Sequence, residues 1–169
     1  TDENTLIYGN NESGKEMFIS TILYSLMIHH HPKEVNIYIA DFGAESLTVF
    51  NGMPHVGDTM IVSDSDKLLG LVKLLNKEYQ KRKKKFVDYA GSFVEYNQNN
   101  EEKFPLILVV LNSIEGFAEA YSRSSDMFDI LYRDGAKYGI TFIVSTSISS
   151  GIRLRVAQNF TNKVCLRMS

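Results

Sequence analysis

Residues 9–16 read Gly9-Asn10-Asn11-Glu12-Ser13-Gly14-Lys15-Glu16, which is the Gly-x-x-x-x-Gly-Lys spacing of a phosphate-binding P-loop. An apolar stretch at residues 5–8 predicts a strand that leads into this loop, and residues 15–29 predict the helix that follows it. Strand, loop and helix in this order are the context that a P-loop requires, so we prefer it to the alternative of an ordinary Gly-rich turn. The face predicted for this helix carries Phe18, Ile22, Ser25, Leu26 and His29.

The last position of the loop departs from the P-loop pattern. The motif requires a Ser or Thr hydroxyl that coordinates Mg²⁺, whereas this chain has the carboxylate of Glu16. Lys15 is the strongest candidate for a phosphate contact, but the charges of Glu12 and Glu16 oppose an anion. We therefore expect ATP to bind weakly or not at all, and Mg²⁺ not to be bound by this module alone. Backbone donors at the helix N-terminus are predicted at Ser13, Gly14, Glu16 and Met17.

Length and composition limit what the chain can be. Its 169 residues, 44% of them hydrophobic, suffice for a full core and predict a single domain, residues 1–169. A net charge of −2 gives no overall attraction to nucleic acid or to anionic lipid. No apolar run is long enough to span a bilayer, and no signal peptide is present. Because the first predicted strand follows Thr1 almost at once, we expect the chain to be a fragment of a larger, multi-domain protein.

The rest of the chain alternates between predicted strands and predicted helices. This alternation predicts an α/β fold with a mostly parallel central sheet and helices on both faces. The polar stretch at residues 92–103 is predicted to be a mobile surface loop, and Cys165 a reduced, buried thiol without a catalytic role. The predicted strands are residues 35–40, 60–62, 106–111, 140–145 and 163–168, and the predicted helices are residues 66–89 and 125–137. The side chains predicted to face the core are Leu68, Leu71, Val72, Leu75, Tyr79 and Phe86 in the first of these helices, and Phe128, Leu131 and Tyr132 in the second.

Ligands of parallel sheets bind at the carboxyl ends of the strands, which here gather the P-loop, Asp41, Asn112-Ser113 and Thr146-Ser147 on one edge. A P-loop hydrolase needs a carboxylate at the end of a buried strand to fix Mg²⁺. The strand 106–111 ends instead in Asn112 and Ser113, and the nearest acid is Glu115. An alternative is that Asn112 and Ser113 only cap the next helix.

Two further acids could replace the missing ones. Asp41 and Glu16 together would form a rearranged metal site, but Mg²⁺ demands near-octahedral geometry from both relocated ligands. We prefer to interpret Asp41 as a loop acid that accepts backbone hydrogen bonds, and we expect no metal site.

Two runs of basic residues have simple interpretations. Residues 77–85 hold six lysines and arginines, which resemble a nucleic-acid or lipid patch. Their helical spacing places most of them opposite the predicted core face, so we prefer a solvated helix surface. The three histidines at residues 29–31 cannot converge on one metal ion from consecutive helix positions, and a helix C-terminus before Pro32 is the better interpretation.

Several segments together resemble an FtsK/SpoIIIE-type ATPase module over nearly the whole chain. The resemblance is greatest to the last module of the membrane ATPase of type VII secretion, the EssC/EccC family, as found in firmicutes. It is carried by residues 9–16, Asp41-Phe42-Gly43, Met53-Pro54-His55-Val56-Gly57, residues 105–113 followed by 117–119, Gly135-Ala136-Lys137-Tyr138-Gly139-Ile140, Ser145-Thr146-Ser147 and Val164-Cys165-Leu166-Arg167.

This resemblance implies a RecA-like P-loop fold and assigns roles to positions of this chain. The Walker A loop falls on residues 9–16, and the Walker B Asp-Glu pair falls on Asn112 and Ser113. In the family's Arg-x-Gly-Arg segment the first Arg is kept as Arg133, whereas the second, a candidate inter-subunit finger, is Ala136. The sensor Gln falls on Ser147. With these positions degenerate, we expect no catalytic residue in this module.

The resemblance also implies a setting. The module is expected at the cytoplasmic face of the cell membrane, in a membrane-anchored parent that forms a higher oligomer. Expected partners are neighbouring ATPase modules of the same chain and secreted substrates with a WXG motif; nucleic acid is not expected. The predicted function is a degenerate ATPase module of a type VII secretion motor with a regulatory, assembly or substrate-recognition role. The alternatives are an active ATPase completed by neighbouring modules and an FtsK-type DNA translocase.

Overall fold

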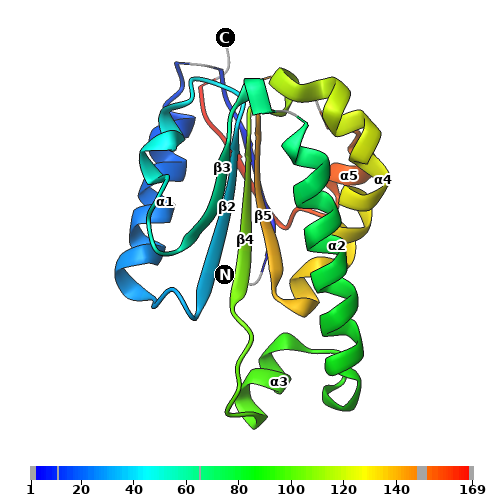
Figure 1. Cartoon of the computed structure of the whole chain (residues 1–169). Coiled ribbons are helices and arrows are strands. Elements are labelled where there is room, and N and C mark those ends of the chain that lie inside the picture. The colour runs from blue at the N-terminus through cyan, green and yellow to red at the C-terminus, as the bar shows by residue number, and fades with distance from the viewer. Residues whose placement is uncertain (1–2, 11, 65, 148–151, 168–169) are drawn as a thin grey trace.

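The computed structural model describes residues 3–10, 12–64, 66–147 and 152–167, which form a three-layer α/β fold (Figure 1). Six strands make one sheet in the order β3-β2-β4-β5-β1-β6, and every described strand pairing is parallel. The predicted fold class is thus confirmed. The strands are β1 (Thr5–Tyr8), β2 (Val35–Asp41), β3 (Val56–Met60), β4 (Leu106–Asn112), β5 (Ile140–Thr146) and β6 (Asn162–Cys165).

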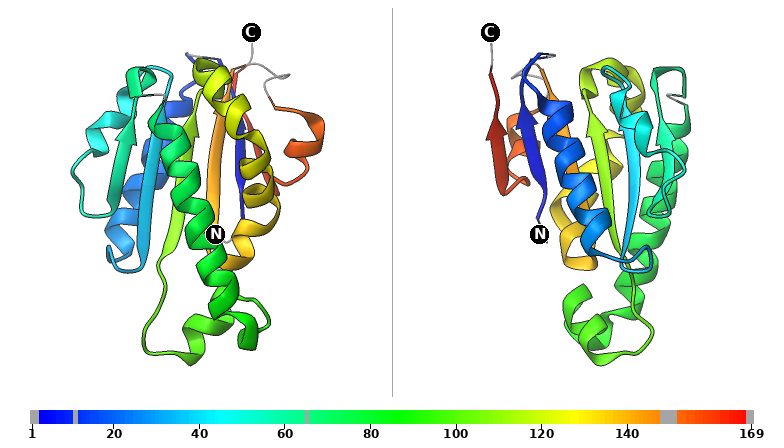
Figure 2. Two further views of the ribbon diagram at one scale, coloured as in Figure 1. Left: turned by 45° about the vertical axis from the view of Figure 1, so that its right-hand side comes forward. Right: turned by 90° about the vertical axis from the view of Figure 1, so that its left-hand side faces the viewer.

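Helices cover both faces of the sheet, α1 on one face and α2 with α4 on the other (Figures 1 and 2). The α-helices are α1 (Lys15–His29), α2 (Lys67–Lys85), α3 (Phe93–Asn99), α4 (Ala118–Asp134) and α5 (Leu154–Ala157). Short 3₁₀ helices are η1 (Ser46–Phe50), η2 (Val62–Asp64), η3 (Val87–Tyr89), η4 (Ile114–Phe117) and η5 (Gly135–Tyr138). No helix among the described residues is long and apolar enough to cross a bilayer.

The strands fill two cores because successive side chains point to opposite faces. Val109 and Leu111 of β4 pack in the core beneath α2 and α4, whereas Leu108 and Val110 pack in the core beneath α1. A strand buried on both faces must be apolar at nearly every position, which explains the unbroken apolar run of residues 106–111.

The core faces predicted for α2 and α4 are confirmed, since all nine predicted side chains are buried. The face predicted for α1 is right in part, since Ile22 and Leu26 pack against the core, whereas Phe18, Ser25 and His29 are exposed. The bounds of the helix are right. Ile19 and Leu23 are its fully buried apolar residues. The helix is apolar nearly all round, so its composition gave no clear periodicity from which to choose a face.

Three other predictions need correction. The third strand lies at Val56–Met60 instead of residues 60–62, because pairing with β2 selects the segment after His55. Cys165 is exposed, since β6 is the edge strand of the sheet and its outer side has no neighbour. The last strand also ends at Cys165.

The predicted loop at residues 92–103 contains the helix α3. Ser92 caps it by accepting a hydrogen bond from the amide of Glu95, and Asn97 exchanges two hydrogen bonds with the backbone of Phe104. Tyr96 packs its ring on Phe86 of the preceding segment at a centroid distance of 4.8 Å. The prediction of a loop is therefore wrong, because aromatic contacts stabilise a helix in this Asn-rich sequence.

Helix α1 ends at His29, where the amide of His30 bonds the carbonyl of Leu26. The three histidines are exposed, and the described residues hold no group of three or more His, Cys, Asp or Glu that could share a metal ion. The C-terminus predicted for the helix at this point is confirmed.

Candidate functional site

The predicted P-loop lies at the carboxyl edge of the sheet, the edge where β1, β2, β4 and β5 end, and passes from β1 into α1. The amide of Ser13 bonds the carbonyl of Asn10 at 3.1 Å, and the hydroxyl of Ser13 bonds the same carbonyl at 2.8 Å. Gly14 has a φ of 81°, a left-handed conformation that favours glycine, and the helix begins directly after it. A Cβ at Gly9 would lie 2.3 Å from the Ser13 hydroxyl, so the loop can close only over glycine.

The amide of Glu12 donates to the side chain of Asn10 at 3.2 Å, which turns the loop tightly. Asn11 lies outside the described residues. Met17 follows in the first turn of α1, and its side chain is 76% exposed. The first amides of a helix have no partner within the helix and carry its partial positive charge, so they form the donor set expected of a phosphate site.

Lys15 is fully buried, and its Nζ atom makes no hydrogen bond with any described residue. The nearest anionic atom is the Oε1 of Glu115 at 4.0 Å, which is the outer limit of an ion pair. A buried ammonium that lacks hydrogen bonds is costly. The Lys15 ammonium could therefore bind an anion in the loop, because the distant contact with Glu115 neutralises only part of its charge.

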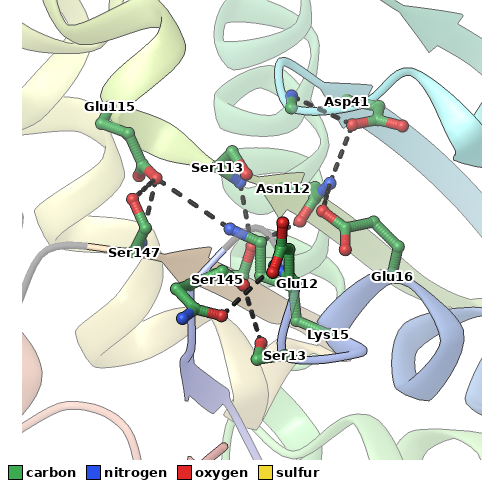
Figure 3. A network of polar contacts seen from close by, with 12 residues as sticks. Glu12, Ser13, Lys15, Glu16, Asp41, Asn112, Ser113, Glu115, Ser145 and Ser147 are labelled. Carbon is green, nitrogen blue, oxygen red and sulfur yellow. Dashed lines mark hydrogen bonds and ion pairs between the residues drawn. The ribbon is translucent and has the colours of Figure 1, made fainter. Parts of the chain in front are cut away.

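Asn112 lies between two carboxylates at the end of β4 (Figure 3). Its side-chain amide donates to Asp41 at 2.8 Å and approaches Glu16 at 3.4 Å, while its oxygen accepts from the hydroxyl of Ser145 at 2.5 Å. Asn112 is fully buried, and these contacts satisfy it on both sides. A neutral donor group thus lies between Asp41 and Glu16, where a metal ion would otherwise have to sit to be shared by the two acids.

Asp41 has the role predicted for a loop acid. Its two oxygens accept hydrogen bonds from the amides of Gly43 at 3.2 Å and Leu47 at 2.9 Å, in addition to that from Asn112. These bonds hold the turn after β2 against the end of β4. The Asp41 carboxylate is fully buried, and the hydrogen bonds that it accepts occupy lone pairs that a metal ion would need.

Ser113 has a φ of 57°, which is unusual for a residue other than glycine. Its amide donates to the hydroxyl of Ser145 at 2.9 Å, but its own hydroxyl is buried without a hydrogen-bond partner. The alternative that Asn112 and Ser113 cap the next helix is wrong, since η4 has no side-chain cap and Asn112 bonds elsewhere.

Glu115 turns back from η4 toward the loop and is held by Ser147 (Figure 3). Its Oε1 accepts from the amide of Ser147 at 2.9 Å and from the Ser147 hydroxyl. Burial acts to raise the pKa of Glu115, but the hydrogen bonds from the Ser147 hydroxyl, from the amides of Glu115 and Ser147 and from Thr146 outweigh it, so the pKa lies below its usual range. The group is therefore a carboxylate at neutral pH, aimed at Lys15.

A small cavity of about 290 Å³ opens between these side chains. Its volume is at the low end of that found for small-molecule sites. Two of its lining residues, Glu16 and Glu115, are acidic, and Glu16 is the one described P-loop residue in the lining. The lining consists of Glu16, Phe42, Gly43, Ala44, Ser113, Glu115, Gly116 and Ser147.

The structure brings most of the predicted positions together but leaves one apart. Residues 9, 10 and 12–17, Asn112, Ser113 and Ser147 all lie at the carboxyl edge. Ala136 lies in η5, before β5 begins, and so at the opposite edge of the sheet. Arg133 near it is exposed and paired with Asp134 at 2.8 Å. Neither residue can reach the P-loop of its own chain.

Sequence reasoning missed the part that Glu115 and Ser145 play. The sequence indicates Glu115 only as the acid nearest to the end of the strand. Its side chain approaches Lys15 because the chain turns tightly at Ser113. Ser145 lies next to the end of β5 and reaches Asn112 because β4 and β5 pair, a pairing that the sequence pattern did not predict.

The model of the FtsK/SpoIIIE family matches residues 1–169. A curated relative, ESX secretion system protein EccC of Geobacillus thermodenitrificans, is 30% identical over 164 residues. That match covers 96% of this chain and 11% of the relative, so the chain spans about a ninth of the relative's length.

Two solved structures have the same fold. The cytoplasmic domain of EssC superposes with a TM-score of 0.93 at 29% identity, over 99% of this chain and 33% of that one. A chain of Geobacillus thermodenitrificans described as EssC (ATPases 2 and 3) gives a TM-score of 0.91 at 30% identity, over 98% of this chain and 32% of that one. The RecA-like class and the resemblance stated from the sequence are both confirmed.

Proposed function

The chain belongs to the FtsK/SpoIIIE family, and on this premise we propose that it is a degenerate ATPase module of a type VII protein-secretion motor. In this proposal the module has a regulatory, assembly or substrate-recognition role and does not hydrolyse ATP. The observation that carries this proposal is the position of Asn112, whose amide bridges Glu16 and Asp41 where a hydrolase needs a metal-binding acid.

The loop keeps the features that bind phosphate and lacks those that bind the metal. Lys15 and the helix N-terminus supply positive charge, but Glu16 stands where the motif places the Mg²⁺-binding hydroxyl. Two misplaced carboxylates, Glu12 and Glu16, weaken anion binding by about tenfold or more. The module therefore binds ATP weakly or not at all, and does so independently of Mg²⁺.

The setting proposed for the module follows from its relatives, of which it spans a small part. A membrane-anchored parent would hold it at the cytoplasmic face of the cell membrane, beside other ATPase modules and within a higher oligomer. Secreted proteins with a WXG motif are the proposed substrates of that parent. Residues 1–169 form one module of it.

Calorimetric titration of ATP, with and without Mg²⁺, tests the nucleotide part of the proposal. We expect the same weak or undetectable binding in both titrations and no phosphate release. The Lys15→Ala variant should lose whatever binding is present, whereas Lys33→Ala, an exposed lysine away from the loop, should keep it. Turnover by the Mg²⁺-supplied chain that Lys15→Ala abolishes would overturn the proposal.

A second candidate is an active ATPase completed by neighbouring modules, which is favoured by the buried ammonium of Lys15, since it has no hydrogen bond with any described residue. In that case a partner module would bring the missing acids to the loop. Turnover by the full-length parent that depends on Lys15 of this module would establish it. The DNA-translocase alternative needs a basic surface that faces DNA, and it is tested together with the groove described next.

A further inference from the structure

Residues at the amino edge of the sheet, where β2 and β4 begin, line a second hollow. This edge lies opposite the end of the sheet at which β1 leads into α1 (Figure 1). The volume of the hollow is about 900 Å³. One wall is the second half of α2, and the other is the segment 102–105 that leads from α3 into β4. We call this hollow the amino-edge groove.

Arg82 fixes the walls of the amino-edge groove relative to each other. The guanidinium is fully buried and donates to the carbonyls of Pro105 at 2.8 Å, Tyr138 at 2.9 Å and Gly139 at 3.2 Å. Its Nε bonds Glu78 at 3.0 Å. Because these bonds tie α2 to the start of β4 and to η5, the groove has a preformed shape.

The positive charge in the groove exceeds what its own acids neutralise. Lys77, Lys81 and Lys85 follow one another at intervals of four residues along α2, so they form a stripe on one side of the helix. Lys103 stands on the facing wall. Only Lys81 of the four pairs with a described carboxylate, that of Glu78 at 3.7 Å, and Glu78 is already shared with Arg82.

Apolar side chains lie beside this stripe. Leu74 is 46% exposed, one turn before Glu78 on α2, and Phe104 contributes a half-buried ring. Tyr96 is buried and packs edge-on against Phe104, and the cations of Lys81 and Arg82 lie over the Phe104 ring at 5.1 and 5.2 Å from its centroid. The groove therefore offers an apolar strip bordered by ammonium groups.

We propose that the amino-edge groove binds an acidic peptide segment of a partner protein, with carboxylates on the lysine stripe and an apolar side chain against Leu74. Two observations favour a peptide over nucleic acid. Glu78 and Glu102 lie within the lining, where they repel a continuous polyphosphate but accept hydrogen bonds from peptide amides. Tyr96 is buried, and the ring of Phe104 already contacts the cations of Lys81 and Arg82, so neither ring is offered freely to a base.

The solvated-surface interpretation of residues 77–85 is confirmed for the five lysines, all of which are exposed, and wrong for Arg82, which is buried. Of these lysines, Lys77, Lys81 and Lys85 line the groove, whereas Lys83 and Lys84 are not part of its lining. The inference does not depend on the proposed nucleotide chemistry, because the groove and the P-loop lie at opposite ends of the strands.

Fluorescence anisotropy with a short labelled peptide of alternating Glu and Leu residues tests the proposal. We expect binding that weakens with salt and that drops by about tenfold or more when Lys77→Glu and Lys85→Glu are combined. The matched control, Lys33→Glu with Lys163→Glu, makes the same change in net charge on exposed positions elsewhere and should bind like the wild type. Leu74→Ala should weaken binding several-fold without any change in charge.

Three outcomes would overturn the proposal. The first is no measurable binding of the peptide, and the second is equal loss of binding in the control pair. The third is tighter binding of a mixed-sequence single-stranded DNA, or of phosphatidylserine vesicles, that Lys77→Glu with Lys85→Glu removes; this result would assign the groove to nucleic acid or to a lipid surface. Circular dichroism of each variant verifies that the fold is intact.

Discussion

Two cationic side chains are fully buried among the described residues, one at each edge of the sheet, and their surroundings are opposite. Arg82 at the amino edge donates to three carbonyls and to Glu78, whereas Lys15 at the carboxyl edge has no hydrogen bond from its ammonium group. A buried charge with all its donors bonded holds parts of the chain together. A buried charge that lacks hydrogen bonds weakens the fold and is suited to binding a ligand. The contrast therefore marks Arg82 as a structural residue and Lys15 as a binding residue.

Arg82→Met should give the largest effect. The substitution removes the Arg82 hydrogen bonds to the carbonyls of Pro105, Tyr138 and Gly139 and to Glu78, although Gly139 keeps the Ile107 amide and Glu78 keeps Lys81. We therefore expect a loss of about 3 kcal/mol or more in the free energy of unfolding. Urea denaturation measures it. Lys84→Met on the same helix, at an exposed position, should change stability by no more than about 0.5 kcal/mol. Equal stability of the two variants would contradict the structural role of Arg82.

Asn112→Asp should have the next largest effect, because it places a third carboxylate beside Asp41 and Glu16. We expect a loss of about 2 kcal/mol at neutral pH from lost hydrogen bonds and from like-charge repulsion. The folded-state pKa of the new carboxyl would be raised, so the destabilisation should be present above its ordinary pKa of about 4 and fade as the pH falls below it. Thermal unfolding across this pH range checks the sign.

Added Mg²⁺ sharpens that experiment. A cation would relieve the repulsion among three acids, so Mg²⁺ should raise the melting temperature of Asn112→Asp and leave that of the wild type unchanged. If Mg²⁺ stabilised the wild type as well, Glu16 and Asp41 would form a metal site despite the amide between them.

Glu115→Gln should strengthen anion binding at Lys15. The substitution removes the only carboxylate within ion-pair distance of the Lys15 ammonium among the described residues, and we expect nucleotide affinity to rise by up to about tenfold, or 1.4 kcal/mol. Calorimetric titration of ATP without metal measures the gain. Glu119→Gln removes an exposed carboxylate and is the matched control. Unchanged affinity in Glu115→Gln would mean that this carboxylate does not oppose the phosphate.

The stability of the same variant has a defined pH dependence. Because the folded-state pKa of Glu115 is lowered, its hydrogen bonds stabilise the fold above the ordinary pKa of a glutamate, and this contribution is lost as the pH falls through the folded-state value. Wild type should therefore exceed Glu115→Gln in stability at neutral pH, and the two should converge in acid. Divergence in acid would contradict the lowered pKa.

Lys15→Met should give the smallest change in stability and one of opposite sign to Arg82→Met. The ammonium has no hydrogen bond with a described residue and only a 4.0 Å contact with Glu115, so replacing it by an apolar side chain of similar length should leave the free energy of unfolding unchanged or raise it by about 1 kcal/mol. Urea denaturation of both variants side by side makes the comparison direct. Similar losses in the two would show that Lys15 also holds the structure together.

The parts of this molecule that sequence predicted are those fixed by local periodicity. The order of strand, loop and helix at residues 5–29 and the core face of α2 follow from the spacing of apolar side chains. Such spacing constrains a segment by itself, so no knowledge of distant contacts was required.

The parts that it missed depend on residues far apart in the chain. The helix α3 forms in an Asn-rich stretch because Tyr96 packs on Phe86, and Cys165 is exposed because its strand has only one neighbour. Likewise, the amide of Asn112 could be placed between two acids only after the turns that follow β2 and β4 were known.

The hydrogen bonds of Asn112 make it difficult for single substitutions at the carboxyl edge to restore a metal site. Restoring an acid at position 112 alone would crowd three carboxylates, and restoring a hydroxyl at position 16 alone would leave the amide facing Asp41 with no metal ligand gained. Each single reversion therefore leads to a protein that is less stable or still lacks the metal site. Proteins that carry Glu16, Asp41 and Asn112 would regain metal-dependent chemistry only if two of these positions changed together.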